Sequence, residues 1–192
     1  HYPKTLDTGM AITEQEAWTD RASDDGEAAI DVHVPHFFRE IIEQIAFEAR
    51  ESEYIDQTSG VSVRVTRAAM EALLSAAERR ALLNGEDETT VRISDLMHVA
   101  PAITGKVELV YEGEQEGAQK VALSLIGQAI RTIYTRYFPN PDDKEKGRPA
   151  YQDVLDWFAS GHSVDLEQDM SDDTYAETLT QIDGLYDLVE EH

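Results

Sequence analysis

The stretch from residue 60 to residue 96 constrains the fold most, because apolar residues recur in it at steps of three and four. These residues are Val65, Ala69, Met70, Leu73, Leu74, Ala77 and Ala81. Their spacing places one apolar stripe along a helix. Asn84 and Gly85 predict where that helix ends, because glycine adopts the left-handed backbone that a helix C-terminus favours. We therefore expect a long amphipathic helix that packs by one face.

The residues after this helix predict a second, shorter one. Val91 to Ile93 is expected to be a short extended piece, and Ser94 and Asp95 to be the cap and first turn of the next helix. Pro101 is expected to interrupt or kink that helix, because proline lacks a backbone N–H donor.

Other segments also carry helical spacing. A short helical piece is predicted from Met10 to about Arg21, with Thr13 as its cap and Glu16 as the capping partner. Longer helices are predicted from Pro35 to about Ser52 and from Gln115 to Tyr137. The composition of the intervening residues predicts a loop over 23–27 and an exposed linker over 142–147. The chain is thus expected to be mainly α-helical, with minor short strand content.

The C-terminal part is acidic. Beyond Arg148 there is no Lys or Arg, while twelve Asp and Glu residues occur. Apolar spacing predicts one helix from Tyr151 to Phe158 and another from Tyr175 to Val189, behind Ser171 as a cap. An acidic amphipathic segment of this kind either folds back on the helical body or docks on a partner.

The formal net charge of -23 argues against a nucleic-acid partner, because phosphate binding depends on clustered Lys and Arg. Such an excess of acid is compatible with a basic partner, a saline cytoplasm or a well-solvated surface. No stretch of eighteen apolar residues occurs, so we expect no membrane span. The absence of cysteine suits a reducing cytoplasm, which is the location we expect.

The segment that opens the long helix resembles the sensor-2 stretch in the helical lid domain of AAA+ ATPases. The resemblance is greatest to magnesium-chelatase ATPase subunits and their MoxR-type relatives, whose lids open with Gly-Ala-Ser-x-Arg. The matching residues here are Gly60, Val61, Ser62 and Arg64, then Ala81, Leu82 and Gly85, and then Val91, Asp95 and Leu96. The wider run from Tyr54 to Glu114 is similar to the magnesium-chelatase group in particular.

The resemblance covers about residues 1 to 138 and implies a domain organisation. Residues 1–32 would join an AAA+ core, residues 33–138 would form the helical lid, and residues 139–192 would be an acidic helical extension. We expect the chain to be the C-terminal portion of a longer ATPase. No Gly-x-x-x-x-Gly-Lys-Ser/Thr loop occurs, so the chain is not expected to hydrolyse ATP alone.

Arg64 is the main candidate for function. A guanidinium in the first turn of a helix, beside exposed backbone N–H groups, makes a local site for an anion such as a nucleotide phosphate. The resemblance implies that Arg64 reaches the γ-phosphate held by the core, and Arg67 is a weaker candidate for the same ligand. It also implies ATP and Mg²⁺ as cofactors of the full-length parent, with neither expected to bind this fragment alone.

The resemblance implies a set of partners as well. These are the AAA+ core, a homo-oligomeric ring, and a von Willebrand factor A-type protein that takes part in metal insertion or protein remodelling. Two alternatives stay open for Arg64 and for the chain. Arg64 could pair with a nearby carboxylate on a short strand formed by Val61, Val63 and Val65. The chain could then be a non-catalytic acidic module that recruits a partner.

Two other patterns contain residue types that bind metal ions. His33 and His36 lie three residues apart, but Pro35 stands between them and no third ligand is fixed beside them. The acidic run from Asp165 to Asp173 lacks the ligand order of a calcium-binding loop. We therefore predict no metal site in this chain.

Overall fold

The structure is a computed structural model that describes residues 2–19, 21, 30–140, 144–145 and 148–191. The chain divides into two compact units, residues 1–133 and residues 134–192. Unit 1 contains α1 (Leu6–Glu16), β1 (Asp31–His33), α2 (His36–Glu51), α3 (Arg64–Asn84), β2 (Glu88–Thr90), a 3₁₀ helix η1 (Ile93–Val99), α4 (Ala100–Thr104), α5 (Tyr111–Glu116) and most of α6 (Ala118–Tyr137). The mainly helical fold with minor strand content is confirmed.

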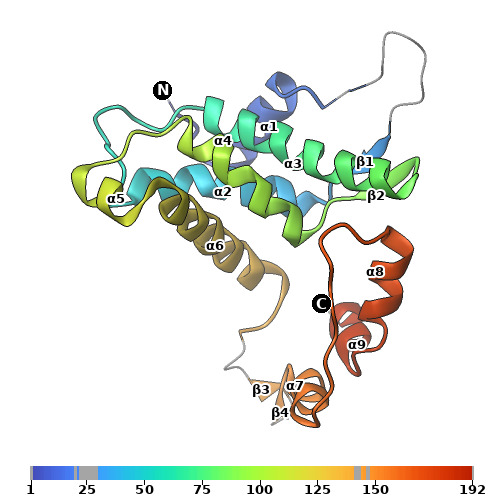
Figure 1. Cartoon of the computed structure of the whole chain (residues 1–192). Helices are drawn as coiled ribbons and strands as arrows, with labels where there is room; N and C mark the ends of the chain where they lie inside the picture. The colour runs from blue at the N-terminus through green and yellow to red at the C-terminus, as the bar shows by residue number, and fades with distance from the viewer. Residues whose placement is uncertain (1, 20, 22–29, 141–143, 146–147, 192) are drawn as a thin grey trace. The chain divides into compact units, whose positions relative to one another are not determined.

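Helix α3 is the centre of unit 1. It contacts α1, α2, β2, η1 and α4 (Figure 1). Its predicted apolar stripe is confirmed, because Val65, Ala69, Leu73 and Ala77 are fully buried. These side chains join the buried residues of α2, η1, α4 and α6 in one hydrophobic cluster. The predicted stop is also confirmed, since Gly85 follows the last helical residue with a left-handed φ of 69°.

The two strands of unit 1 form a short parallel pair. Asp31 pairs with Glu88, and the pairing continues to His33 and Thr90. Strand β2 (Glu88–Thr90) therefore lies three residues before the extended piece that was predicted over Val91–Ile93. Pro101 does not interrupt a helix, because it lies in the first turn of α4, where a missing N–H costs nothing.

Two predicted helix starts differ from the observed ones. Helix α1 begins at Leu6 and not at Met10, because Thr5 caps it by accepting a hydrogen bond from the Thr8 N–H. Thr13 is therefore not a cap but a buried residue inside the helix. The helix predicted from Gln115 is divided at Gly117, where a φ of 97° separates α5 from α6. The start of α2 after Pro35 is confirmed.

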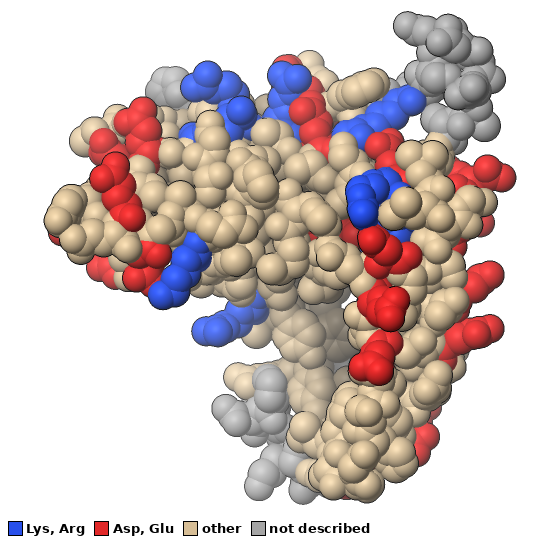
Figure 2. All heavy atoms as spheres, in the orientation of Figure 1, with Lys and Arg blue, Asp and Glu red and all other residues tan. Residues whose placement is uncertain are grey.

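Unit 2 contains α7 (Gln152–Ala159), α8 (Asp172–Leu179), α9 (Leu185–Glu190) and the short antiparallel strands β3 (Lys144–Glu145) and β4 (Arg148–Pro149). Ser171 caps α8 as predicted, since its hydroxyl accepts from the Thr174 N–H. The helix predicted up to Val189 is divided in two, because α8 ends at Leu179 and α9 begins after Gly184, which has a φ of 78°. No Lys or Arg occurs beyond Arg148. The lower right of the face drawn in Figure 2 carries red, acidic side chains and no blue, basic ones.

Some expectations fall on residues that are not described. The predicted loop over 23–27 lies wholly outside the described ranges, and the predicted linker over 142–147 lies partly outside them. None of the described helices combines the length and the apolar character that crossing a bilayer requires. The division of the chain into core-joining segment, lid and extension stays a prediction.

Candidate functional site

The chain segment that enters α3 is held by an aromatic and an arginine contact. Gly60 has a left-handed φ of 68°, and a side chain at this position would overlap the Tyr2 hydroxyl. Arg50 lies over the Tyr2 ring, 5.2 Å from its centroid, and donates two 3.4 Å hydrogen bonds to the Val61 carbonyl. The first residue of α3, Arg64, therefore projects from a fixed backbone.

Arg64 is exposed and has no acidic partner. Its side-chain Nε and its backbone N–H donate to the Ser62 hydroxyl oxygen at 3.2 and 3.3 Å. No ion pair joins its guanidinium to any residue in the described part of the chain. The alternative in which Arg64 lies on a short strand is wrong, because α3 begins at this residue. The Ser62 hydroxyl thus orients the guanidinium of an exposed side chain.

Three backbone N–H groups of this helix start, including that of Arg64, already have acceptors. The Val65 N–H donates to the Ser62 carbonyl at 3.0 Å, and the Arg67 N–H donates to the Val63 carbonyl at 3.1 Å. The capacity of this helix start to bind an anion therefore rests on the Arg64 side chain, and less on the backbone than the sequence suggested.

Arg67 is in a different position. Its Nε forms an ion pair with the Glu71 carboxylate at 3.0 Å, four residues along the same helix. The Glu71 carboxylate also accepts the Trp18 backbone N–H at 3.2 Å. Partial burial would raise the pKa of Glu71, but these hydrogen bonds outweigh it and lower that pKa. Arg67 is thus already paired with a carboxylate that stays ionised.

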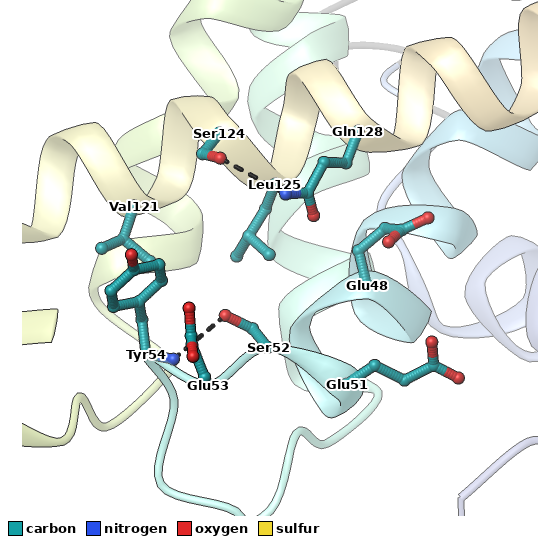
Figure 3. Close-up of a pocket in the computed structure, with 9 residues that line it drawn as sticks. All are labelled: Glu48, Glu51, Ser52, Glu53, Tyr54, Val121, Ser124, Leu125 and Gln128. Carbon is teal, nitrogen blue, oxygen red and sulfur yellow. Dashed lines mark hydrogen bonds between the residues drawn. The ribbon is translucent and has the colours of Figure 1, made fainter.

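A second site was not predicted from the sequence. A pocket of about 400 Å³ lies between the C-terminal end of α2 and the middle of α6 (Figure 3). Its lining consists of Glu48, Glu51, Ser52, Glu53, Tyr54, Val121, Ser124, Leu125 and Gln128. We name it the α2–α6 pocket. The three glutamates close to the end of α2 were a sequence signal, but the sequence does not indicate which part of α6 faces them.

The hydrogen bonds of the α2–α6 pocket are unevenly distributed. Glu48 accepts hydrogen bonds from Gln44 Nε2 at 2.8 Å and from the Thr132 hydroxyl at 3.0 Å. Glu51 and Glu53 have no hydrogen bond or ion pair with a described residue. Both residues are exposed, and in Figure 3 the Glu51 carboxylate points away from Glu53.

A buried carboxylate joins the first three helices. Glu43 on α2 is 2% exposed and accepts a short hydrogen bond from the Thr13 hydroxyl of α1. The Thr13 hydroxyl is in turn 2.8 Å from the Thr66 hydroxyl of α3. Burial raises the pKa of Glu43, although the two hydroxyls and Arg50 oppose that shift. Glu43 also borders a pocket of about 430 Å³ that is lined by residues of α1, α2 and α3.

The described residues contain no group of three or more His, Asp or Glu side chains that could hold a metal ion. His33 on β1 and His36 on α2 therefore have no third ligand among them. Comparison of the chain with family models, with curated proteins and with solved structures finds no match.

Proposed function

We propose that unit 1 acts as the lid of an AAA+ ATPase of the magnesium-chelatase group, in which Arg64 binds the γ-phosphate of ATP held by a P-loop core. The observation that carries the proposal is the Arg64 guanidinium, which is exposed, oriented by Ser62 and without an ion-pair partner among the described residues. A guanidinium in this state can form a charge-assisted, bidentate contact with phosphate oxygens.

The role of Arg64 in this proposal is electrostatic. Charge develops on the oxygens of the transferring phosphoryl group, and a guanidinium beside them lowers the barrier. Bound ATP supplies the phosphoryl group, and we assign the Mg²⁺ ligands to the core, because the described residues offer no group of metal ligands. A ring of subunits, a von Willebrand factor A-type partner and a cytoplasmic location complete the proposal.

The ATPase rate of the protein that combines this chain with its P-loop core tests the role of Arg64. We expect Arg64→Ala to lower ATP turnover by at least about tenfold, because one charge-assisted contact to the reacting group is lost. The melting temperature should stay nearly unchanged, since an exposed residue contributes at most about 0.5 kcal/mol.

Arg67→Ala is the matched control, because it removes the same charge one turn further along the same helix. We expect it to affect turnover much less, since Arg67 is paired with Glu71. Parental turnover in both variants would contradict the proposal and favour the second candidate, an acidic interaction module. The two unpaired carboxylates of the α2–α6 pocket favour that second candidate.

A further inference from the structure

Arg50, in the last turn of α2, carries a guanidinium that has few hydrogen-bond acceptors. Its Nε and Nη2 share a single acceptor, the Val61 carbonyl, at 3.4 Å each. Its Nη1 is closed off from solvent and has no hydrogen-bond partner among the described residues. A buried donor without an acceptor is unfavourable for stability. The stability of unit 1 alone therefore does not explain a guanidinium at this position.

The surroundings of Arg50 hold its guanidinium in place. It lies over the rings of Tyr2 and Phe47, at 5.2 and 5.0 Å from their centroids. Aromatic faces attract a cation but accept no strong hydrogen bond from it. Burial lowers the pKa of Arg50, although the Glu43 carboxylate opposes that shift. The hydrogen bonds of this guanidinium are thus directed at one backbone carbonyl.

That carbonyl belongs to the segment that enters α3. Val61 is fully buried, and no other described residue donates to its carbonyl oxygen. The preceding Gly60 has a φ of 68°, and the Tyr2 hydroxyl occupies the space that a side chain at this position would need. Arg50 and Tyr2 therefore both hold residues 60 and 61 in place. We name this arrangement the Arg50 clamp.

The Arg50 clamp ends one residue before the group that orients Arg64. Ser62 follows Val61 directly, and its hydroxyl accepts the Arg64 Nε–H at 3.2 Å. A rotation of the backbone at Val61 moves this hydroxyl, and the Arg64 guanidinium moves with it. The path from Arg50 to Arg64 thus consists of the peptide between Val61 and Ser62 and one hydroxyl group.

We propose that Arg50 is a positioning residue for Arg64, because it holds the Val61 carbonyl and thereby fixes the direction in which the Arg64 guanidinium points. The consequence for ATP turnover rests on the function proposed above for Arg64. A contact with a reacting phosphoryl group depends steeply on position, and a shift of about 1 Å can lower a rate by a large factor. Arg50 acts on the reaction only through Arg64.

The first test measures the position of Arg64 in the full chain without nucleotide. Arg50→Met keeps an unbranched side chain beside the two rings and removes every donor to the Val61 carbonyl. We expect faster amide hydrogen exchange at residues 62–65, because the entry to α3 opens locally more often. The ¹⁵N NMR signal of Arg64 Nε should shift as well, since the hydrogen bond to Ser62 is weakened.

Two further variants accompany Arg50→Met. Arg39→Met is the matched control, because Arg39 lies on the same helix but pairs with Glu14 of α1, and it should leave both signals unchanged. Tyr2→Ala removes one ring of the clamp at a residue that is 47% exposed, so little core packing is lost. It should change exchange at 62–65 in the same direction as Arg50→Met, and it tests the clamp even if Arg50→Met does not fold.

The second test measures turnover in the protein that combines this chain with its P-loop core. Arg50→Met should lower kcat by at least about threefold with little change in KM, because the core still binds ATP while the Arg64 contact is misaligned. In an Arg64→Ala background it should cause no further loss. Arg50→Lys, which keeps the charge and a donor without the planar fork, should restore part of the exchange protection and of kcat.

Several results would overturn the inference. Unchanged Arg64 signals in both Arg50→Met and Tyr2→Ala would exclude the positioning role, and an equal change in Arg39→Met would mean a general effect of charge on α2. Losses of turnover that add in the double variant would mean that Arg50 acts independently of Arg64. If Arg64→Ala lowers turnover and Arg50→Met does not, only the positioning role fails. Parental turnover in Arg64→Ala would instead overturn the proposed function, and the NMR and exchange measurements alone would then decide whether Arg50 positions Arg64.

Discussion

Arg80 and Asp95 form an ion pair that solvent scarcely reaches, with side-chain exposures of 1% and 3%. Arg80 also donates to the Thr89 hydroxyl at 2.7 Å and to the Thr90 carbonyl at 2.9 Å. Asp95 accepts the Arg92 N–H at 2.7 Å. A buried pair of this kind adds little net stability, but it fixes one arrangement of the groups that it joins. Here it fixes β2 and η1 against the C-terminal half of α3.

Glu43 should make stability depend on pH. Its pKa is raised above 4.5 in the folded state, so the bound proton stabilises the fold fully below that value. This stabilisation is lost as the pH rises through the folded-state pKa. Glu43→Gln keeps an oxygen acceptor for Thr13 and removes the buried charge. We therefore expect the variant to be more stable than the parent at neutral pH, with a difference that shrinks on acidification.

Urea unfolding of the two proteins over a series of pH values measures this difference. Glu51→Gln on the same helix is the control, because Glu51 is exposed and unpaired among the described residues. A Glu43→Gln variant that is less stable than the parent at neutral pH would contradict the role given to burial.

Single residues were predictable where their function depends on local position. The exposure of Arg64 at a helix start followed from the apolar stripe behind it. The pairing of Arg80 with Asp95 and of Thr13 with Glu43 did not follow, because each pair joins residues from different elements. Periodicity along one helix carries no information on which buried polar group it meets on another.

At the scale of elements, apolar periodicity predicted α2, α3 and α6 because each has a long stripe on one face. Boundaries were less predictable. The periodic pattern runs through Gly117 and Gly184 without change, yet a left-handed φ at Gly117 separates α5 from α6, and α8 ends at Leu179, five residues before Gly184. A glycine that only lowers helix propensity cannot be distinguished by sequence alone from one that ends the helix.

Gly117 and Gly127 provide a direct comparison between these two kinds of glycine. Gly117 has a φ of 97°, and no atom lies within 4 Å of a β-carbon placed there. Gly117→Ala should destabilise unit 1 by about 1–2 kcal/mol through backbone strain alone. Gly127 lies inside α6 with equally open space, so Gly127→Ala should stabilise the unit by about 0.5–1 kcal/mol.

The free energy of unfolding of both variants in urea measures these effects. Shifts of the same sign would show that the bend between α5 and α6 is not imposed by the Gly117 backbone. The Gly127 variant also serves as the control for adding a methyl group to this part of the chain.

At the scale of the whole molecule, every residue of the described hydrophobic cluster lies in unit 1. In unit 2, only Ile182 and Leu188 are buried apolar side chains among the described residues, each 8% exposed. Unit 1 therefore has the core that independent folding requires, whereas a segment of this size with so few buried apolar groups does not.

Truncation after Asn140 should leave a protein that melts cooperatively, because the whole cluster is retained. The complementary fragment, residues 134–192, should show no cooperative transition. Thermal unfolding followed by circular dichroism distinguishes these outcomes. A loss of cooperative melting in the 1–140 protein would mean that apolar residues of unit 2, such as Phe158 and Leu179, are needed to complete the core.

Helix α3 has 21 residues and contains neither glycine nor proline. At a rise of 1.5 Å per residue it is about 30 Å long, with Arg64 at its first position and Arg80 in its last turns. Without a residue that permits a sharp kink, such a helix turns as one rigid rod. A rotation of about 10° around its first turn would displace its far end by about 5 Å, which is roughly the rise of one helical turn.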